Sequence, residues 1–110
     1  MALQHQNLAD GKWFSMTLAE QMGNIGSEVG RTISWREKGN EDYAEKAFVR
    51  SLELIDLTLA DDRWRGPKRR EIARARESWC ASASGNSEPD RALSRYFTAF
   101  AILARTQKGF

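Results

Sequence analysis

The side chains that most readily bind metals or act as nucleophiles are scarce in this sequence. Its one histidine is His5 and its one cysteine is Cys80. A zinc site needs several such ligands at close spacing, and a serine or cysteine nucleophile needs a histidine base. The sequence also lacks a glycine-rich loop that would hold a phosphate. We therefore expect no catalytic residue, metal or cofactor; an enzyme would require side chains such as Glu20, Glu28 and Tyr96 to meet in one pocket.

Seven cations lie close together between positions 63 and 76, and their shared charge suggests a binding function. They are Arg63, Arg65, Lys68, Arg69, Arg70, Arg74 and Arg76, with Trp64 among them. Cations bind phosphates and a tryptophan stacks on a base, so this segment is the best indication of RNA or DNA binding. However, its cations lie on several sides of the expected helix, and Glu71 and Glu77 interrupt them. A solvated helix and a protein-binding surface remain competing interpretations.

A strip of small residues distinguishes the segment from 17 to 38. Gly23, Gly26 and Gly30 follow one another at steps of three and four residues. Each glycine costs a helix about 1 kcal/mol relative to alanine, so a close contact must offset the cost of all three. Small residues let another backbone approach closely, either within the chain or from a second copy or partner helix.

Two tryptophans stand out by their surroundings. Trp35 falls on the polar side of its expected helix, near Glu28 and Arg31, and Trp64 lies between two arginines. Tryptophan beside arginine is typical of binding hot spots. Each of the two is therefore either covered by another part of the chain or an anchor of an interface.

Four helices are expected to position these residues. Apolar side chains recur at steps of three and four over segments 17–38, 42–60, 67–85 and 87–107. This is helical periodicity, and no alternating strand pattern occurs. Capping pairs are expected to open three of the helices: Thr17 with Glu20, Asp42 with Glu45, and Ser87 with Asp90. The sequence predicts an all-α protein, an antiparallel four-helix bundle.

The expected organisation is an N-terminal arm followed by one domain. Residues 1–15 form an irregular arm anchored by Trp13 and Phe14, and residues 16–110 form a single four-helix domain. The wide apolar faces of segments 42–60 and 87–107 predict that these two helices are the most buried. The narrow seam of segment 67–85 predicts a peripheral helix.

Composition excludes several classes of protein. Hydrophobic residues make up 41% and charged residues 29% of the 110 residues, which is typical of a globular domain. A net charge of +2 gives no overall attraction to nucleic acid. No apolar run reaches the roughly 18 residues of a membrane span, and no secretion signal is recognisable. We expect a cytoplasmic protein, since a single cysteine suits a reducing compartment.

Two resemblances add to this interpretation. The segment GNEDYAEKAFVRSLELID resembles one helix of a tetratricopeptide-type repeat, with Ala44, Phe48, Ser51 and Leu52 at the matching spacing. The stretch from LAEQMGNIGSEVGRTISW through AFVRSLELIDLTLADDR is similar to a family of short bacterial proteins of unassigned function. The second resemblance implies a helical bundle and brings no activity or catalytic residue with it.

The sequence therefore favours a non-enzymatic protein-interaction module. We expect it to self-associate through the strip of Gly23, Gly26 and Gly30 together with Trp35 and Trp64, and its partner to be itself or another protein. The alternative is an RNA- or DNA-binding protein that uses the basic segment 63–76. Neither hypothesis involves a membrane.

Overall fold

Four α-helices make up most of the chain. The computed structural model describes residues 11–84 and 91–107. The helices are α1 (Leu18–Glu37), α2 (Glu41–Leu59), α3 (Pro67–Ser84) and α4 (Arg91–Gln107), with short 3-10 turns at Trp13–Ser15 and Asp62–Trp64. The residues described contain no strand. The expected all-α fold is confirmed, and each helix begins and ends within a few residues of its predicted bounds.

Local sequence signals explain where the first two helices begin. The backbone N–H of Glu20 donates to Thr17 Oγ1 at 3.1 Å and that of Thr17 donates to Glu20 Oε1 at 2.9 Å, which is the expected capping box. α2 begins differently, because Asn40 is its cap and accepts from the N–H of Tyr43 at 3.0 Å. Gly39 before it has a φ of +78°, which permits the sharp turn after α1. The expected pair of Ser87 and Asp90 lies outside the described residues.

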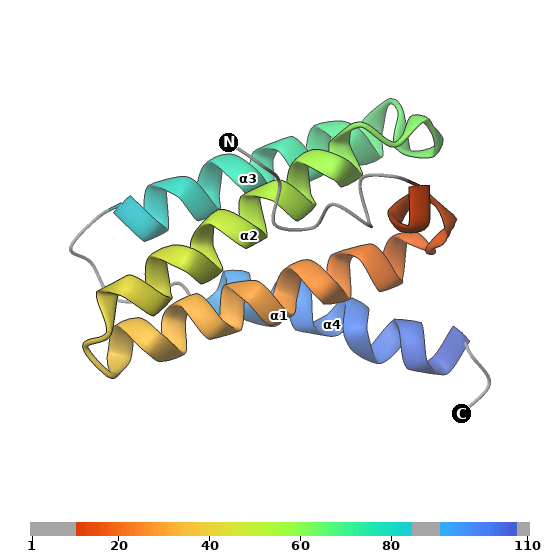
Figure 1. Ribbon diagram of the computed structural model, residues 1–110. Coiled ribbons are helices and arrows are strands. Elements are labelled where there is room, and N and C mark those ends of the chain that lie inside the picture. The colour runs from red at the N-terminus through yellow and green to blue at the C-terminus, as the bar shows by residue number, and fades with distance from the viewer. Residues whose placement is uncertain (1–10, 85–90, 108–110) are drawn as a thin grey trace.

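α1 is the central element of the bundle (Figure 1). It packs against α2 on one side and α4 on the other, while α3 packs against α2 and touches α4 little. α1 and α2 are antiparallel, since Trp35 near the end of α1 meets Tyr43 near the start of α2. α2 and α3 are antiparallel by the same reasoning, because Asp56 pairs with Arg76 and Ser51 with Trp79. The two outer helices are thus α3 and α4.

The core follows this arrangement and corrects one expectation. α1 is the most buried helix, with Met22, Ile25 and Val29 almost fully covered. α4 contributes the buried Leu93 and Phe97 but leaves other apolar side chains in solvent, so the expectation that it is one of the two most buried helices is wrong. The reason is that α4 packs closely against a single neighbour, α1.

The chain before α1 is tied to the core at Trp13. This side chain is fully buried, and Phe14 beside it is partly buried against the same cluster. The expected anchor of the N-terminal arm is thus observed over Gly11–Ser15, while residues 1–10 of that arm lie outside the described part. Among the residues described, no helix combines the length and apolarity that crossing a membrane requires.

Candidate functional site

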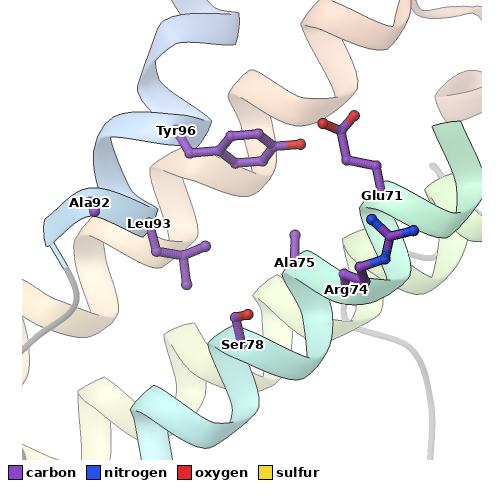
Figure 2. Close-up of a pocket in the computed structure, with 7 residues that line it drawn as sticks. All are labelled: Glu71, Arg74, Ala75, Ser78, Ala92, Leu93 and Tyr96. Carbon is purple, nitrogen blue, oxygen red and sulfur yellow. The ribbon is translucent and has the colours of Figure 1, made fainter. Parts of the chain in front are cut away.

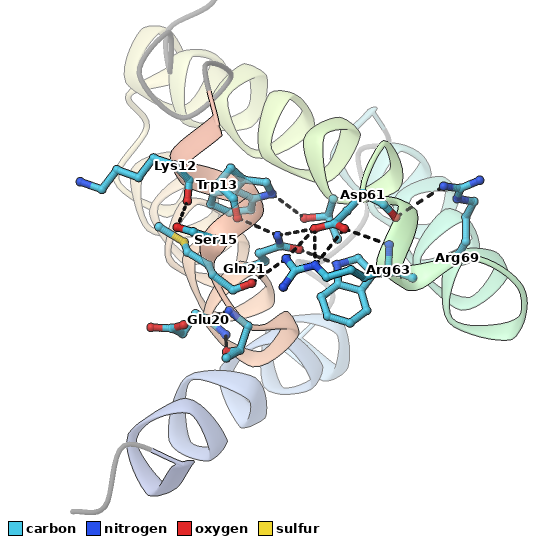
Figure 3. A network of polar contacts seen from close by, with 12 residues as sticks. Lys12, Trp13, Ser15, Glu20, Gln21, Asp61, Arg63 and Arg69 are labelled. Atoms are coloured by element: carbon cyan, nitrogen blue, oxygen red, sulfur yellow. Dashed lines mark hydrogen bonds and ion pairs between the residues drawn. The ribbon is translucent and has the colours of Figure 1, made fainter.

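A buried network of polar side chains joins the 3-10 turn at Trp13–Ser15 to the end of α2 and the loop that follows it (Figure 3). Gln21, fully buried on α1, donates from Nε2 to the carbonyl of Trp13 at 2.9 Å and to Asp61 Oδ2 at 3.0 Å. Its Oε1 accepts from Trp64 Nε1 at 2.9 Å. The indole of Trp13 donates to Thr58 Oγ1 at 3.0 Å. These groups satisfy one another, so the network stabilises the fold. At its edge, Arg69 Nε is buried and has no partner among the described residues.

Asp61 carries the charge of this network. Arg63 donates to it from Nη2 at 2.7 Å and from Nε at 3.0 Å, and its backbone N–H adds a third bond. These bonds, with a further one from Gln21, outweigh burial and lower the pKa of Asp61 to about 2. Arg63 also donates to the carbonyl of Met16 at 2.7 Å. The ion pair therefore ties the loop after α2 to the start of α1.

The basic segment 63–76 is largely occupied by contacts within the chain. Besides Arg63, Arg65 pairs with Asp62 at 3.0 Å and Arg76 with Asp56 at 2.9 Å. Arg69 donates to the carbonyl of Asp61 at 3.5 Å. Three cations make no side-chain ion pair or hydrogen bond with another described residue: Lys68, Arg70 and Arg74. The structure thus gives four of the seven cations an intramolecular role.

The small-residue strip of α1 is packed against α4. A Cβ on Gly26 would lie 2.8 Å from Phe97 Cβ, and one on Gly23 would lie 3.1 Å from Ala101 Cα. The close contact that these residues predicted is therefore found inside the chain. Gly26 is buried in this contact, and Gly23 is partly exposed beside it. Gly30 lies beyond this contact, and a Cβ added there would meet no described atom within 4 Å.

Trp35 lies away from this strip and is partly covered by α2. Its ring meets Tyr43 edge-on at 4.8 Å, and Lys38 Nζ lies 5.1 Å from the ring centroid. With Lys46 and Arg50, the two rings line a small cavity of about 270 Å³. Trp64 lies elsewhere, under Arg63 at 4.5 Å and bonded to Gln21. The two tryptophans expected to share an interface therefore belong to different regions.

A cavity of about 350 Å³ separates α3 from α4 (Figure 2). α3 contributes Glu71, Arg74, Ala75 and Ser78, and α4 contributes Ala92, Leu93 and Tyr96. Because Ala75 and Ser78 are small, they leave space opposite the larger side chains of α4. The side chains of Tyr96 and Glu71 extend toward each other across this space.

A second cavity of about 390 Å³ lies further along the same two helices. Lys68 lines it from α3, one turn before Glu71, and Phe100 and Leu103 line it from α4, beginning one turn after Tyr96. Trp64 and the first residues of α1, Thr17–Ala19, complete its lining. Tyr96, which lines the first cavity, and Phe100, which lines the second, have ring centroids 5.4 Å apart. We call the combined feature the α3–α4 groove.

The hydroxyl of Tyr96 is an unusual group within the α3–α4 groove. Its Oη is buried and has no hydrogen-bond partner among the residues described. Burial raises the pKa of Tyr96, and the nearby carboxylate of Glu71 raises it further. The phenol therefore stays protonated and can donate one hydrogen bond. A buried donor without an acceptor costs free energy that an acceptor from outside the chain would recover.

The side chains that an enzyme would have needed do not assemble around Tyr96. Glu20 caps α1, and Glu28 is held by Arg31 and by Arg50, the latter at 2.8 Å. The described residues contain no cluster of three or more histidine, cysteine or acidic side chains that would hold a metal ion. The groove is suited to binding by shape, apolar contact and charge.

The sequence does not predict most of the α3–α4 groove. Trp64, Lys68 and Arg74 are among the expected site residues, but the sequence assigns them to other surfaces. Ala75 and Leu103 have no expected functional role, although the apolar face of segment 87–107 is visibly wider than one neighbouring helix covers. That width is the available signal, because Leu103 remains 45% and Ile102 55% exposed.

Comparison with protein-family models, with curated proteins and with solved structures gives no match for this chain.

Proposed function

We propose that this chain is a non-enzymatic protein-interaction module that binds a helix of a partner protein in the α3–α4 groove. The observation that carries the proposal is the open contact between the two outer helices. Both pack on the central pair, yet the contact between them is small and two cavities are lined by residues of both helices. A groove between two helices is a surface that a further helix fills, with its side chains set between theirs.

The dimensions and lining of the groove support a helical occupant. Its α3 wall extends from Lys68 to Ser78, which corresponds to about 15 Å, or three helical turns. Apolar groups of Tyr96, Phe100 and Leu103 line the α4 wall over about 10 Å, or two helical turns. Burying them under a partner would remove apolar surface from water, and this is the main source of affinity in such interfaces.

A selection from a random-sequence peptide library tests the proposal. The full chain serves as bait, and the variant Ser78→Trp, whose indole would fill the groove, serves as the comparison. Ser34→Trp is the matched control, because Ser34 is also exposed but lies on α1 outside the groove lining.

Enrichment of amphipathic helical sequences that bind the unaltered chain and Ser34→Trp, but not Ser78→Trp, would support the groove as the binding site. Enrichment that is equal on all three proteins, or absent from all three, would refute it. Sedimentation of the chain alone shows whether a second copy occupies the groove instead.

A second candidate is the binding of RNA or DNA through segment 63–76. It is favoured by Lys68, Arg70 and Arg74, whose side chains have no ion pair with a described residue. It predicts an affinity for a single strand of about 20 nucleotides that falls steeply with salt and is lost when Lys68, Arg70 and Arg74 are all changed to Glu. The absence of any binding at low salt would exclude it.

A further inference from the structure

Charge is divided unequally between the two halves of the bundle. α3 contains five cations and two acids, and α4 contains three arginines and no acid. α1 contains two cations and three acids, and α2 contains two cations and five acids. The outer pair of helices therefore has a net charge of +6 and the central pair has one of −4. The near-neutral total of the chain conceals this separation.

Part of this positive charge lies at the rims of the α3–α4 groove. Lys68 and Arg74 line the α3 side, are exposed, and form no ion pair with a described residue. On α4, Arg95 is exposed and lies one turn from Ala92 of the lining. Glu71 is the one acidic residue that lines either cavity. The rims thus favour a negatively charged occupant over an apolar floor.

The same charge distribution disfavours a second copy as the occupant. In a two-fold dimer each residue of the surface faces the same surface of the other copy. Such a contact through the groove would bring Lys68, Arg74 and Arg95 of both chains together. Like charges facing each other across an interface oppose association. The partner is therefore a different chain.

We infer that the partner element is an acidic amphipathic helix of about three turns, which rests apolar side chains on Tyr96, Phe100 and Leu103 and presents carboxylates to Lys68 and Arg74. The inference rests on the proposed function, and it adds the chemical class of the partner. Tyr96 Oη is buried without an acceptor, and it donates a hydrogen bond to an oxygen of this helix when the bound helix displaces the side chains that cover it. A nucleic acid would supply negative charge but no apolar face for the α4 wall.

Three fluorescent synthetic peptides test the inference. All carry the same leucine and alanine positions along one helical face, and their remaining positions are all Glu, all Gln or all Lys. We expect the Glu peptide to bind at least about ten-fold more tightly than the Gln peptide, with the Lys peptide weakest. Raising the salt from about 50 to about 200 mM should reduce the advantage of the Glu peptide.

Charge reversal identifies which cations are responsible. The double variant Lys68→Glu with Arg74→Glu should bind the Lys peptide more tightly than the Glu peptide. The matched control is Lys38→Glu with Lys46→Glu, which removes two exposed cations near α2 and should leave the order unchanged. Tyr96→Phe should weaken binding of the Glu peptide by about three- to ten-fold without lowering the Tm of the free chain.

The possible results separate the inference from the proposed function. If the three peptides bind equally and Ser78→Trp prevents all of them, the groove binds helices but the acidic partner is wrong. A second result also rejects the inference and leaves the proposed function standing. In this case none of the three peptides binds, yet the library selection yields other peptides that bind the unaltered chain and not Ser78→Trp. If a single strand of about 20 nucleotides displaces the Glu peptide and binds more tightly, nucleic acid is the partner and both fail.

Discussion

Two regions of this bundle use their polar side chains in opposite ways. Around Gln21 and Asp61, the side-chain donors of Gln21, Trp13, Trp64 and Arg63 have acceptors within the chain, although Arg69 Nε beside Asp61 has none among the described residues. In the α3–α4 groove, Tyr96 Oη has no acceptor and Lys68 has no ion pair among the described residues. The first region has the properties of a structural core, whereas the second is the surface at which we propose that a partner binds. Substitutions in the two regions should therefore have different effects on stability.

The largest effect is expected at Gln21. Gln21→Leu would leave the carbonyl of Trp13 and the indole N–H of Trp64 without their buried partners, and each such loss costs about 1 to 3 kcal/mol. We expect the free energy of unfolding to fall by about 3 kcal/mol or more, measured by urea denaturation. The exposed neighbour Asn24, changed to Leu, should alter it by less than about 0.5 kcal/mol. Equal effects at both positions would contradict a structural role for the network.

Asp61 should give the next largest effect, and one that depends on pH. Its pKa of about 2 lies below the ordinary 3.8, so its contribution is fully present above about pH 4 and is lost as the pH falls to 2. Asp61→Asn should therefore lower the free energy of unfolding by about 2 kcal/mol at pH 7 and flatten its dependence between pH 4 and 2. Denaturation curves at four pH values measure this. An unchanged slope in the variant would assign the acid sensitivity to other groups.

Two glycines of α1 should respond in opposite directions. Gly26→Ala places a methyl group 2.8 Å from Phe97 Cβ, and the overpacking should exceed the gain in helix propensity, for a net loss of about 1 kcal/mol. Gly30→Ala meets no described atom within 4 Å and should gain about 0.5 to 1 kcal/mol. Thermal unfolding of the two variants compares them directly. A stabilising Gly26→Ala would show that α4 does not pack closely against this strip.

The smallest effect on stability is expected in the groove. Tyr96→Phe removes a hydroxyl that has no partner among the described residues of the free chain, so the free energy of unfolding should stay the same or rise by about 0.5 kcal/mol. Denaturation by urea provides the measurement. A loss above about 1 kcal/mol would mean that Tyr96 Oη is satisfied within the chain, and the contrast between the two regions would disappear.

Local signals in the sequence were sufficient to predict the helices. The capping box of Thr17 and Glu20 depends on a few adjacent residues and occurs as expected, whereas Asn40 caps α2 in place of the expected pair of Asp42 and Glu45. The close packing of Gly23 and Gly26 was also foreseeable from their cost in a helix. That their neighbour is α4 was not foreseeable, because this depends on how the helices are arranged in space.

The candidate site could be predicted only in fragments. Tyr96 belonged to the apolar face of segment 87–107, and nothing in its local sequence separates a buried tyrosine from one that lines a groove. Arg63 was one cation in a run of seven, and its role depends on the position of Asp61 beside the start of α1. The charges of the four helices can be counted in the sequence. The sequence does not show that the two basic helices, α3 and α4, lie beside each other and line one groove.

NMR mapping of the Glu peptide on the isotope-labelled chain tests most directly whether the α3–α4 groove binds an acidic helix. We predict that the largest changes in amide chemical shift on titration occur at the groove lining, around Lys68, Ala75, Tyr96 and Leu103. Residues near Trp35 and Gly30, outside the groove lining, should change little. Changes centred on Trp35, or spread evenly over all four helices, would contradict the account.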